Sequence, residues 1–201
     1  MKTAENTKDS KKSHHLRVFA LATAVAFVLG TCAYIYFYPT LIYNNFKKAI
    51  VHNGLGSGSA IPVNKLYTVP ILASPSAKSN LLTTGANHDT LYTVGWLDLK
   101  EKPLVLHVPD MNGRYYSIQF TDPMDGSDFA YVGQRTTGAE AGDYLVTGPG
   151  WSGSVPPGMK RISSPDNRVL IIGRVLVEND NDLTTAYNLS KQIRLTSQPG
   201  Q

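Results

Sequence analysis

The sequence predicts a mainly β domain, an antiparallel sandwich or barrel with one C-terminal helix, preceded by an N-terminal transmembrane helix. Three features predict this fold: an uncharged apolar run at residues 18–38, closely spaced extended segments from about residue 80 onward, and an amphipathic segment after residue 180. Strands separated only by short turns leave little room for crossover helices, so antiparallel pairing is favoured.

The apolar run "VFALATAVAFVLGTCAYIYFY" contains no charged residue. As a helix it is long enough to cross a hydrocarbon core of about 30 Å. A cleaved signal peptide is one alternative, but its apolar region would be only about 7–15 residues long and would end at a small-residue cleavage site. Lipoprotein processing at Cys32 is the other alternative. We therefore expect residues 18–38 to be an uncleaved membrane anchor.

The charge distribution predicts the orientation of this anchor. Residues 1–17 hold five Lys/Arg and two Asp/Glu, which leaves 14 basic and 13 acidic side chains for the rest of the chain. Basic residues favour the cytoplasmic side, so we expect a single-pass protein of the cell membrane with a cytoplasmic N-terminus. The C-terminal domain would then be extracytoplasmic, and periplasmic in a Gram-negative cell. Its near-neutral charge argues against nucleic acid as a partner.

Five segments follow from this reading. Residues 1–17 form the basic tail, 18–38 the transmembrane helix, 39–61 a stalk with a Gly/Ser linker, 62–195 the β-rich domain and 196–201 a C-terminal tail. The first half of the stalk carries apolar residues near helical spacing, so it either lies along the bilayer surface or extends the helix.

The β-rich domain has six segments typical of strands. They are residues 90–99, 103–110, 114–122, 129–133, 143–150 and 167–178. The alternation of side chains between the two faces of a strand is clearest at residues 115–121. The pair Asn112-Gly113 lies between two of these segments and predicts a β-hairpin. The segment "NDNDLTTAYNLSKQIRL" predicts one helix, capped within residues 180–182 and packed on the sheet.

Several blocks resemble one known family. They are "NHDTLYTVGWLDL", "PLVLHVPDMNGRYYSIQFTD", "FAYVGQRTTGAEAGDYLVTGPGW", "SPDNRVLIIGRVLV" and a closing "DL…Q". Together they resemble the domain of unknown function 1254 over about residues 62–195. The resemblance implies a β-dominated fold and brings no established reaction. Many members of that family continue into a second β-rich domain, the domain of unknown function 1214. We expect this chain to be a single-domain, membrane-anchored version. A separate chain could then supply the second domain.

Candidate ligand-binding residues are Asn87, His88, Asp89, Arg114 and Tyr116. Amide, carboxylate and guanidinium groups beside aromatic rings suit a sugar or another amphipathic small molecule. For Asn87 and Asp89 the alternative is a turn, since Asx side chains readily bind nearby backbone amides.

Two functional classes remain open at this point. One is a non-catalytic domain that binds a small molecule or an envelope partner while tethered to the bilayer through residues 18–38. The other is a hydrolase-like enzyme acting on a small extracytoplasmic substrate, with His88, Asp89 and Arg114 at its site. Because the sequence has no Gly-x-Ser-x-Gly elbow, we assign no catalytic residue.

We expect neither a metal nor another cofactor. The histidines available to the domain are His52, His88 and His107, and they do not form an HxH or HExxH motif. Three aspartates at 122, 125 and 128 invite a calcium interpretation, but they lack the EF-hand pattern and are typical of solvated turns.

Arg174 interrupts the apolar run "VLIIGRVLV", which predicts a buried guanidinium that pairs with a carboxylate. Arg114 begins another strand block, and its guanidinium likewise requires a carboxylate partner. For either arginine, the alternative to an internal ion pair is a clamp that binds the carboxylate of a ligand. The candidate partners for both arginines are Asp89, Asp98, Asp110 and Asp122.

Overall fold

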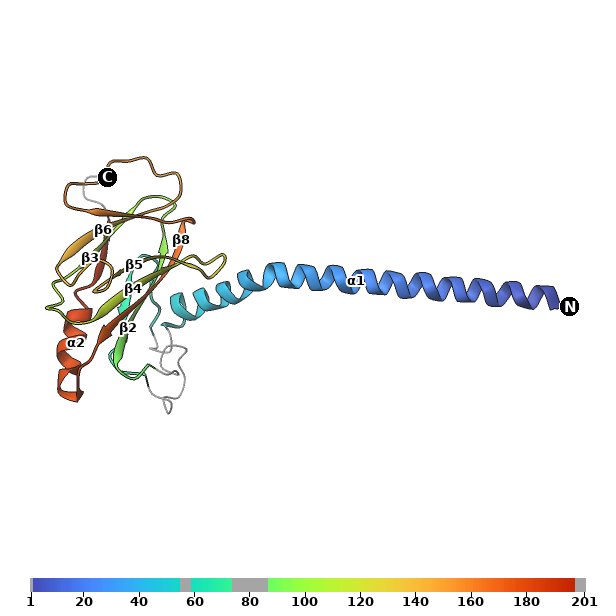
Figure 1. Cartoon of the computed structure of the whole chain (residues 1–201), viewed down its shortest axis with the longest axis horizontal. Helices are drawn as coiled ribbons and strands as arrows, with labels where there is room; N and C mark the ends of the chain where they lie inside the picture. The colour runs from blue at the N-terminus through green and yellow to red at the C-terminus, as the bar shows by residue number, and fades with distance from the viewer. Residues whose placement is uncertain (1, 55–58, 74–86, 198–201) are drawn as a thin grey trace. The chain divides into compact units, whose positions relative to one another are not determined.

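A computed structural model describes residues 2–54, 59–73 and 87–197 of the chain. Residues 55–58 of the predicted linker and 198–201 of the predicted tail lie outside the described residues. The chain divides into two compact units, one up to Ile42 and the other from Tyr43 onward (Figure 1).

The N-terminal helix is longer than the predicted anchor. Helix α1 covers Lys2–Val51 and includes Pro39 in its interior. Its stretch His14–Val51 is long and apolar enough to cross a membrane. None of the residues in its most apolar part is buried inside the protein. Of the two alternatives for the stalk, the helical extension is the one the structure shows.

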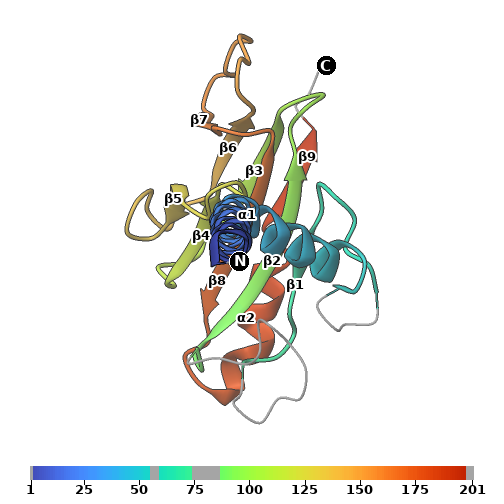
Figure 2. The same cartoon turned by 90° about the vertical axis from the view of Figure 1, so that its right-hand side faces the viewer.

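The β-rich unit is built from two sheets, so of the two predicted alternatives, sandwich and barrel, the structure shows the sandwich. One sheet has five strands in the order β1-β2-β8-β4-β5, and the other has four in the order β7-β6-β3-β9 (Figure 2). All pairs are antiparallel except β6–β7, which is parallel. The strands are β1 (Leu66–Thr68), β2 (Thr90–Asp98), β3 (Leu104–Val108), β4 (Tyr116–Thr121), β5 (Asp128–Gly133), β6 (Gly142–Thr147), β7 (Lys160–Ser163), β8 (Arg168–Leu176) and β9 (Arg194–Ser197).

The main core lies between the two sheets. Strand β8 pairs with β2 on one side and β4 on the other, so every second residue of all three strands faces the same way. Leu97, Phe120 and Ile171 from this sheet join Leu106 and Val146 from the other in one buried cluster.

A second cluster covers part of the outer face of the five-stranded sheet. Ile50, near the end of α1, is fully buried with Val94, Trp96 and Leu170. The Tyr43 ring lies against Trp96, with the ring centroids 4.7 Å apart. The last turns of α1, from Tyr43 onward, therefore pack as part of the β-rich unit.

The predicted hairpin at Asn112-Gly113 is wrong, although the turn itself is present. Both residues have positive φ, 49° and 74°, as a tight turn of this composition requires. The flanking strands, however, do not pair with each other, because β3 lies between β6 and β9 while β4 lies between β8 and β5. The turn carries the chain from one sheet to the other.

The C-terminal segment also differs from the prediction. A 3-10 turn, η2 (Asp180–Asp182), leads into helix α2 (Leu183–Ser190), which ends earlier than expected. Ile193 is buried beyond the helix, and β9 follows it as an edge strand. Helix α2 packs Ala186 against Leu91 and Val177 near the end of the five-stranded sheet.

Candidate functional site

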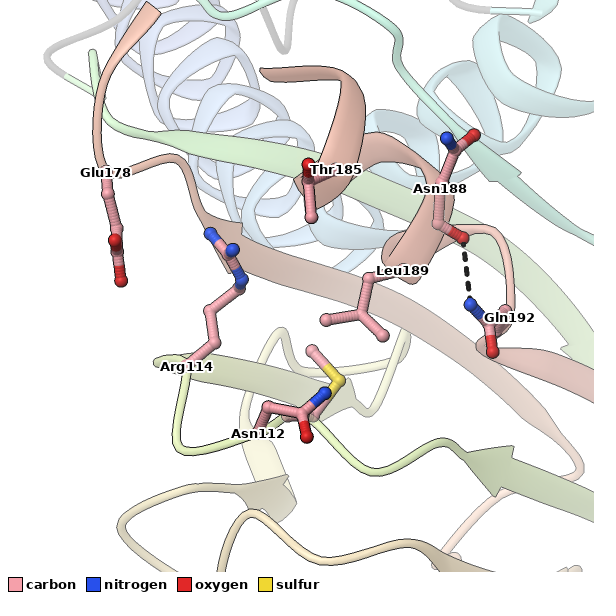
Figure 3. A pocket seen from close by; sticks show the side chains of 8 residues that line it. Asn112, Arg114, Glu178, Thr185, Asn188, Leu189 and Gln192 are labelled. Atoms are coloured by element: carbon pink, nitrogen blue, oxygen red, sulfur yellow. Dashed lines mark hydrogen bonds between the residues drawn. The ribbon is translucent and has the colours of Figure 1, made fainter. Parts of the chain in front are cut away.

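A cavity of about 420 Å³ lies where the turn after β3, the end of β8 and helix α2 meet (Figure 3). Its lining residues are Met111, Asn112, Arg114, Glu178, Thr185, Asn188, Leu189 and Gln192. Figure 3 shows Leu189 between Arg114 on one side and Asn188 and Gln192 on the other.

Arg114 is held rigidly at the edge of this cavity. Its guanidinium forms a two-pronged ion pair with Asp182, in which Nη2 donates to Oδ1 at 2.8 Å, and Nη1 also donates to the Leu176 carbonyl at 2.8 Å. Both side chains are nearly buried, at 12% and 13% exposed. The hydrogen bonds from Arg114 hold the pKa of Asp182 below its usual range, and they raise the pKa of Arg114.

This pairing corrects the expected partners of Arg114, which were Asp89, Asp98, Asp110 and Asp122. Asp182 stands at the N-cap of α2, as the sequence suggests, but its carboxylate makes no side-chain cap hydrogen bond. It instead accepts from Arg114 and from the Glu178 amide at 2.9 Å. The ion pair thus fastens the start of α2 to the turn before β4.

The other polar side chains around the cavity are exposed. Within the described parts of the chain, the side chains of Asn112, Glu178, Thr185 and Asn188 have no hydrogen-bond partner. Gln192 makes one long hydrogen bond, 3.4 Å from its Nε2 to the Asn188 carbonyl. Fully buried Met111 and half-buried Leu189 supply the apolar part of the lining. Free amides around an apolar patch are typical of small-molecule sites.

The predicted cluster at the start of β2 is not assembled with Arg114. Asn87 instead stabilises a turn, since its Oδ1 accepts from the Thr90 amide at 3.2 Å and from the Thr90 hydroxyl at 2.9 Å. His88 and Asp89 are exposed, and no described residue forms a hydrogen bond with either side chain. The backbone carbonyl of Asp89 accepts from Val177 at 2.7 Å.

Tyr116 lies in the core and does not line the cavity beside Arg114, although it contributes to the lining of a second cavity on the five-stranded sheet. The residue is fully buried, and its hydroxyl donates to the Gly138 carbonyl at 3.0 Å. Burial raises the pKa of this hydroxyl. Its ring packs in the main cluster between the sheets.

Arg174 is half-buried on the outer face of the five-stranded sheet, whereas the sequence predicts a core position and a carboxylate partner. Its Nη1 donates to the Gln119 Oε1 at 3.1 Å, and its guanidinium lies 5.5 Å from the centre of the Tyr92 ring. The ion pairs of the described residues do not include it. Its neighbours Gly173 and Val175 face the core, so alternation along β8 turns Arg174 outward.

The remaining titratable candidates are dispersed. His107 pairs with Asp143 across β3 and β6, with Nδ1 2.7 Å from Oδ1. Asp122 and Asp125 accept from backbone amides two residues further on, as Asx turns do. Among the residues that the structure describes, no three His, Cys, Asp or Glu side chains group as metal ligands.

The fold and cavity define a β-sandwich domain that follows a long apolar helix and holds a polar pocket beside its C-terminal helix. Residues 63–197 match the family model of a protein of unknown function, DUF1254, and the chain belongs to this family. The chain is also similar to the crystal structure of the VPA0106 protein from Vibrio parahaemolyticus, with a TM-score of 0.63 and 28% identity. That likeness covers 82% of this chain and 37% of the Vibrio protein, so the chain spans little more than a third of its relative. A comparison with curated proteins finds no match.

Sequence reasoning missed most of the cavity's free polar groups. Thr185 and Asn188 are spaced by three residues, so they share one side of α2, and Gln192 follows two residues after the helix ends at Ser190. The polar face of the predicted helix was therefore the signal that could have located them. Nothing in the local sequence links this face to Arg114, which is 68 residues away from Asp182.

Proposed function

We propose that this DUF1254 protein is a membrane-anchored extracytoplasmic domain that binds a small polar molecule in the cavity beside Arg114. The observation that supports it most is the set of free side chains around Leu189. Three amides, a hydroxyl and a carboxylate line one cavity of about 420 Å³ and retain unused hydrogen-bonding capacity. Such a combination of apolar surface and convergent polar groups is typical of a ligand site.

The charges of the cavity favour one class of ligand over others. Asp182 neutralises Arg114, so the guanidinium serves to position the surrounding turn and helix. Glu178 then adds a carboxylate that forms no ion pair within the described residues, although its charge acts on nearby Arg114. Carboxylates only accept hydrogen bonds, while amides both donate and accept. A neutral or cationic molecule rich in O–H or N–H groups therefore fits this lining best.

The geometry favours binding over the hydrolase-like alternative at His88, Asp89 and Arg114. Nucleophilic catalysis needs a nucleophile within hydrogen-bond reach of a base that a third group orients. His88 and Asp89 are exposed, and Arg114 is committed to Asp182 and Leu176.

Anchoring rests on helix α1. Its apolar stretch has the length and hydropathy of a membrane span, and five basic residues precede the predicted span at residues 18–38. The bilayer would thus be the partner of this segment, and the positive-inside rule supports a cytoplasmic location for residues 1–17. The β-rich domain would lie outside it, in the periplasm of a Gram-negative cell.

The binding proposal can be tested by a thermal-shift screen of the full chain in a non-ionic detergent. Sugars, polyols, amino acids and polyamines serve as probes, and at least one class should raise the melting temperature, because a ligand that binds only the folded state stabilises it. The shift should disappear in Asn188→Ala and Glu178→Gln. Asn181→Ala is the matched control, since this exposed asparagine lies next to α2 but outside the cavity.

Two outcomes would contradict the proposal. One is the absence of a shift with every probe class. The other is a shift of equal size in Asn188→Ala and in Asn181→Ala, which would place binding elsewhere.

A further inference from the structure

A second cavity, of about 310 Å³, opens on the outer face of the five-stranded sheet. It is separate from the cavity beside Arg114, because the two share no lining residue. Its polar lining includes Tyr115, Ser117, Gln119, Tyr131, Arg135 and Arg174.

Strand register explains why Arg174 lines this cavity. Tyr92, Arg174, Ser117 and Gly133 stand opposite one another across β2, β8, β4 and β5, so they share one face of the sheet. The row ends in a glycine, where a Cβ would approach the Tyr116 carbonyl to 2.6 Å. No side chain can therefore stand at this position and fill the space beside Ser117.

The charge of Arg174 is not neutralised by direct contact. Gln119 links it to Asp128, accepting from Arg174 at 3.1 Å and donating to the Asp128 Oδ1 at 2.8 Å. Asp128 also accepts from the hydroxyls of Thr121 and Tyr131. Since a guanidinium has five N–H donors and only one is used here by the described residues, Arg174 keeps donors for a ligand.

Arg135 brings a second guanidinium to the same cavity. It lies 5.3 Å from the centre of the Tyr115 ring, much as Arg174 lies over Tyr92. Arg135 is exposed, and within the described residues its guanidinium has neither an ion pair nor a hydrogen bond. Stacking on a ring orients a guanidinium while leaving its in-plane donors free.

We propose that this cavity binds a small organic anion that carries a carboxylate or phosphate group on a planar apolar body. The guanidinium fork matches either group in a bidentate manner. The faces of Tyr115 and Tyr131 would contact the apolar body. The volume is near the lower end of the range for small-molecule pockets, about 300–1,000 Å³, which suits a one-ring ligand.

Isothermal titration calorimetry of the full chain in a non-ionic detergent tests this inference with three probes of similar shape. Benzoate represents the carboxylates, phenyl phosphate represents the phosphates, and benzamide is the neutral control. At least one anion should bind saturably and at least about tenfold more tightly than benzamide, since recognition depends on the charge. Raising the salt concentration from about 0.05 to 0.5 M should weaken this binding, because salt screens exposed charges.

Three variants locate the site. Arg174→Met should weaken binding of the preferred anion at least about tenfold, and Arg135→Gln at least about threefold, because each removes one guanidinium. Arg161→Met is the matched control, as this arginine lies 4.8 Å from the Trp151 ring centre on the other sheet and outside the cavity. It should leave the affinity within about twofold.

The inference fails if neither anion binds at about 10 mM, an affinity too weak to indicate a built site. It also fails if benzamide binds as tightly as the anions, or if Arg161→Met weakens binding as much as Arg174→Met. Should Arg174→Met not fold, the exposed Arg135 decides the result, because its replacement leaves the sheet unchanged. Failure here would leave the proposed binding beside Arg114 untouched, since the two cavities are independent.

Discussion

Arg114 and Asp182 join two segments that the sequence alone does not bring together. Their ion pair links the turn before β4 to the start of α2, and the same carboxylate accepts from the Glu178 amide. Because both side chains are largely buried, removing either one leaves the other with unsatisfied charge. The pair therefore contributes to stability while it shapes the edge of the cavity.

Replacing this carboxylate should destabilise the fold. In Asp182→Asn we expect the free energy of unfolding to fall by about 2 kcal/mol, the range of hydrogen bonds to charged groups, because an amide cannot neutralise Arg114. Urea unfolding of the full chain in detergent at pH 7 measures the difference. Asp180→Asn, which alters an exposed neighbour, should differ from wild type by no more than about 0.5 kcal/mol.

The difference in stability between the wild type and Asp182→Asn should also depend on pH. Hydrogen bonds from Arg114 lower the pKa of Asp182 in the folded state. A lowered folded pKa means that the stabilisation is fully present above the unfolded value of about 3.9 and is lost as the pH falls through the folded pKa. The difference between wild type and Asp182→Asn should therefore shrink below about pH 4. A difference that stayed constant to pH 2 would contradict this assignment of the stabilisation to the ionised pair.

Among the elements, helix α1 combines an apolar stretch with a C-terminal end that packs on the β-rich unit. Residues up to Ile42 are grouped as one unit, whereas Tyr43, Phe46 and Ile50 pack on the outer face of the five-stranded sheet. Their apolar spacing was visible in the sequence. It fits a bilayer surface as well as it fits a protein surface, so the pattern alone could not assign the segment to the β-rich domain.

A pair of isoleucines in α1 tests this packing. Ile50 is fully buried, so Ile50→Ala should lower the free energy of unfolding of the β-rich unit by about 2–5 kcal/mol. Ile42 is 51% exposed, and Ile42→Ala should have little effect. Urea unfolding followed by tryptophan fluorescence is suited to the comparison, since Trp96 lies in the same cluster as Ile50. Equal effects of the two substitutions would show that the helix end does not pack on the sheet.

The sequence predicted the elements whose pattern is local and long. Strand β4 and strand β8 alternate or run apolar over six and nine residues, and both were located. Strands β1, β7 and β9 have three or four residues each, too few for a period to be recognised. The turn at Asn112-Gly113 was predicted from its composition, but which sheet each flanking strand joins depends on the whole core.

The candidate site was less predictable than the fold for the same reason. Arg114 was selected from its strand block, yet its partner came from a segment expected only to cap a helix. Asn87 has the local turn contact that its type and position indicate. His88 and Asp89 were grouped because they are adjacent, but adjacency along a chain does not place side chains in a shared cavity.

The whole molecule comprises a basic tail, an apolar helix and a β-sandwich whose cavities include the one beside Arg114 and the one beside Arg174. The family match covers residues 63–197 and the apolar stretch of α1 precedes it, so the two proposed roles, anchoring and binding, fall on different segments. The proposed function requires that the cavity beside Arg114 be open to the extracytoplasmic side.

The most direct test is site-specific labelling in intact cells. Cys32 is the only cysteine, so a Cys32→Ser background allows single cysteines to be introduced at Asn188, which lines the cavity, and at Ser10 in the basic tail. A membrane-impermeant maleimide should label Asn188→Cys in intact cells, after outer-membrane permeabilisation where an outer membrane is present, and should label Ser10→Cys only after lysis. Labelling of Ser10→Cys in intact cells, with Asn188→Cys protected until lysis, would contradict the account.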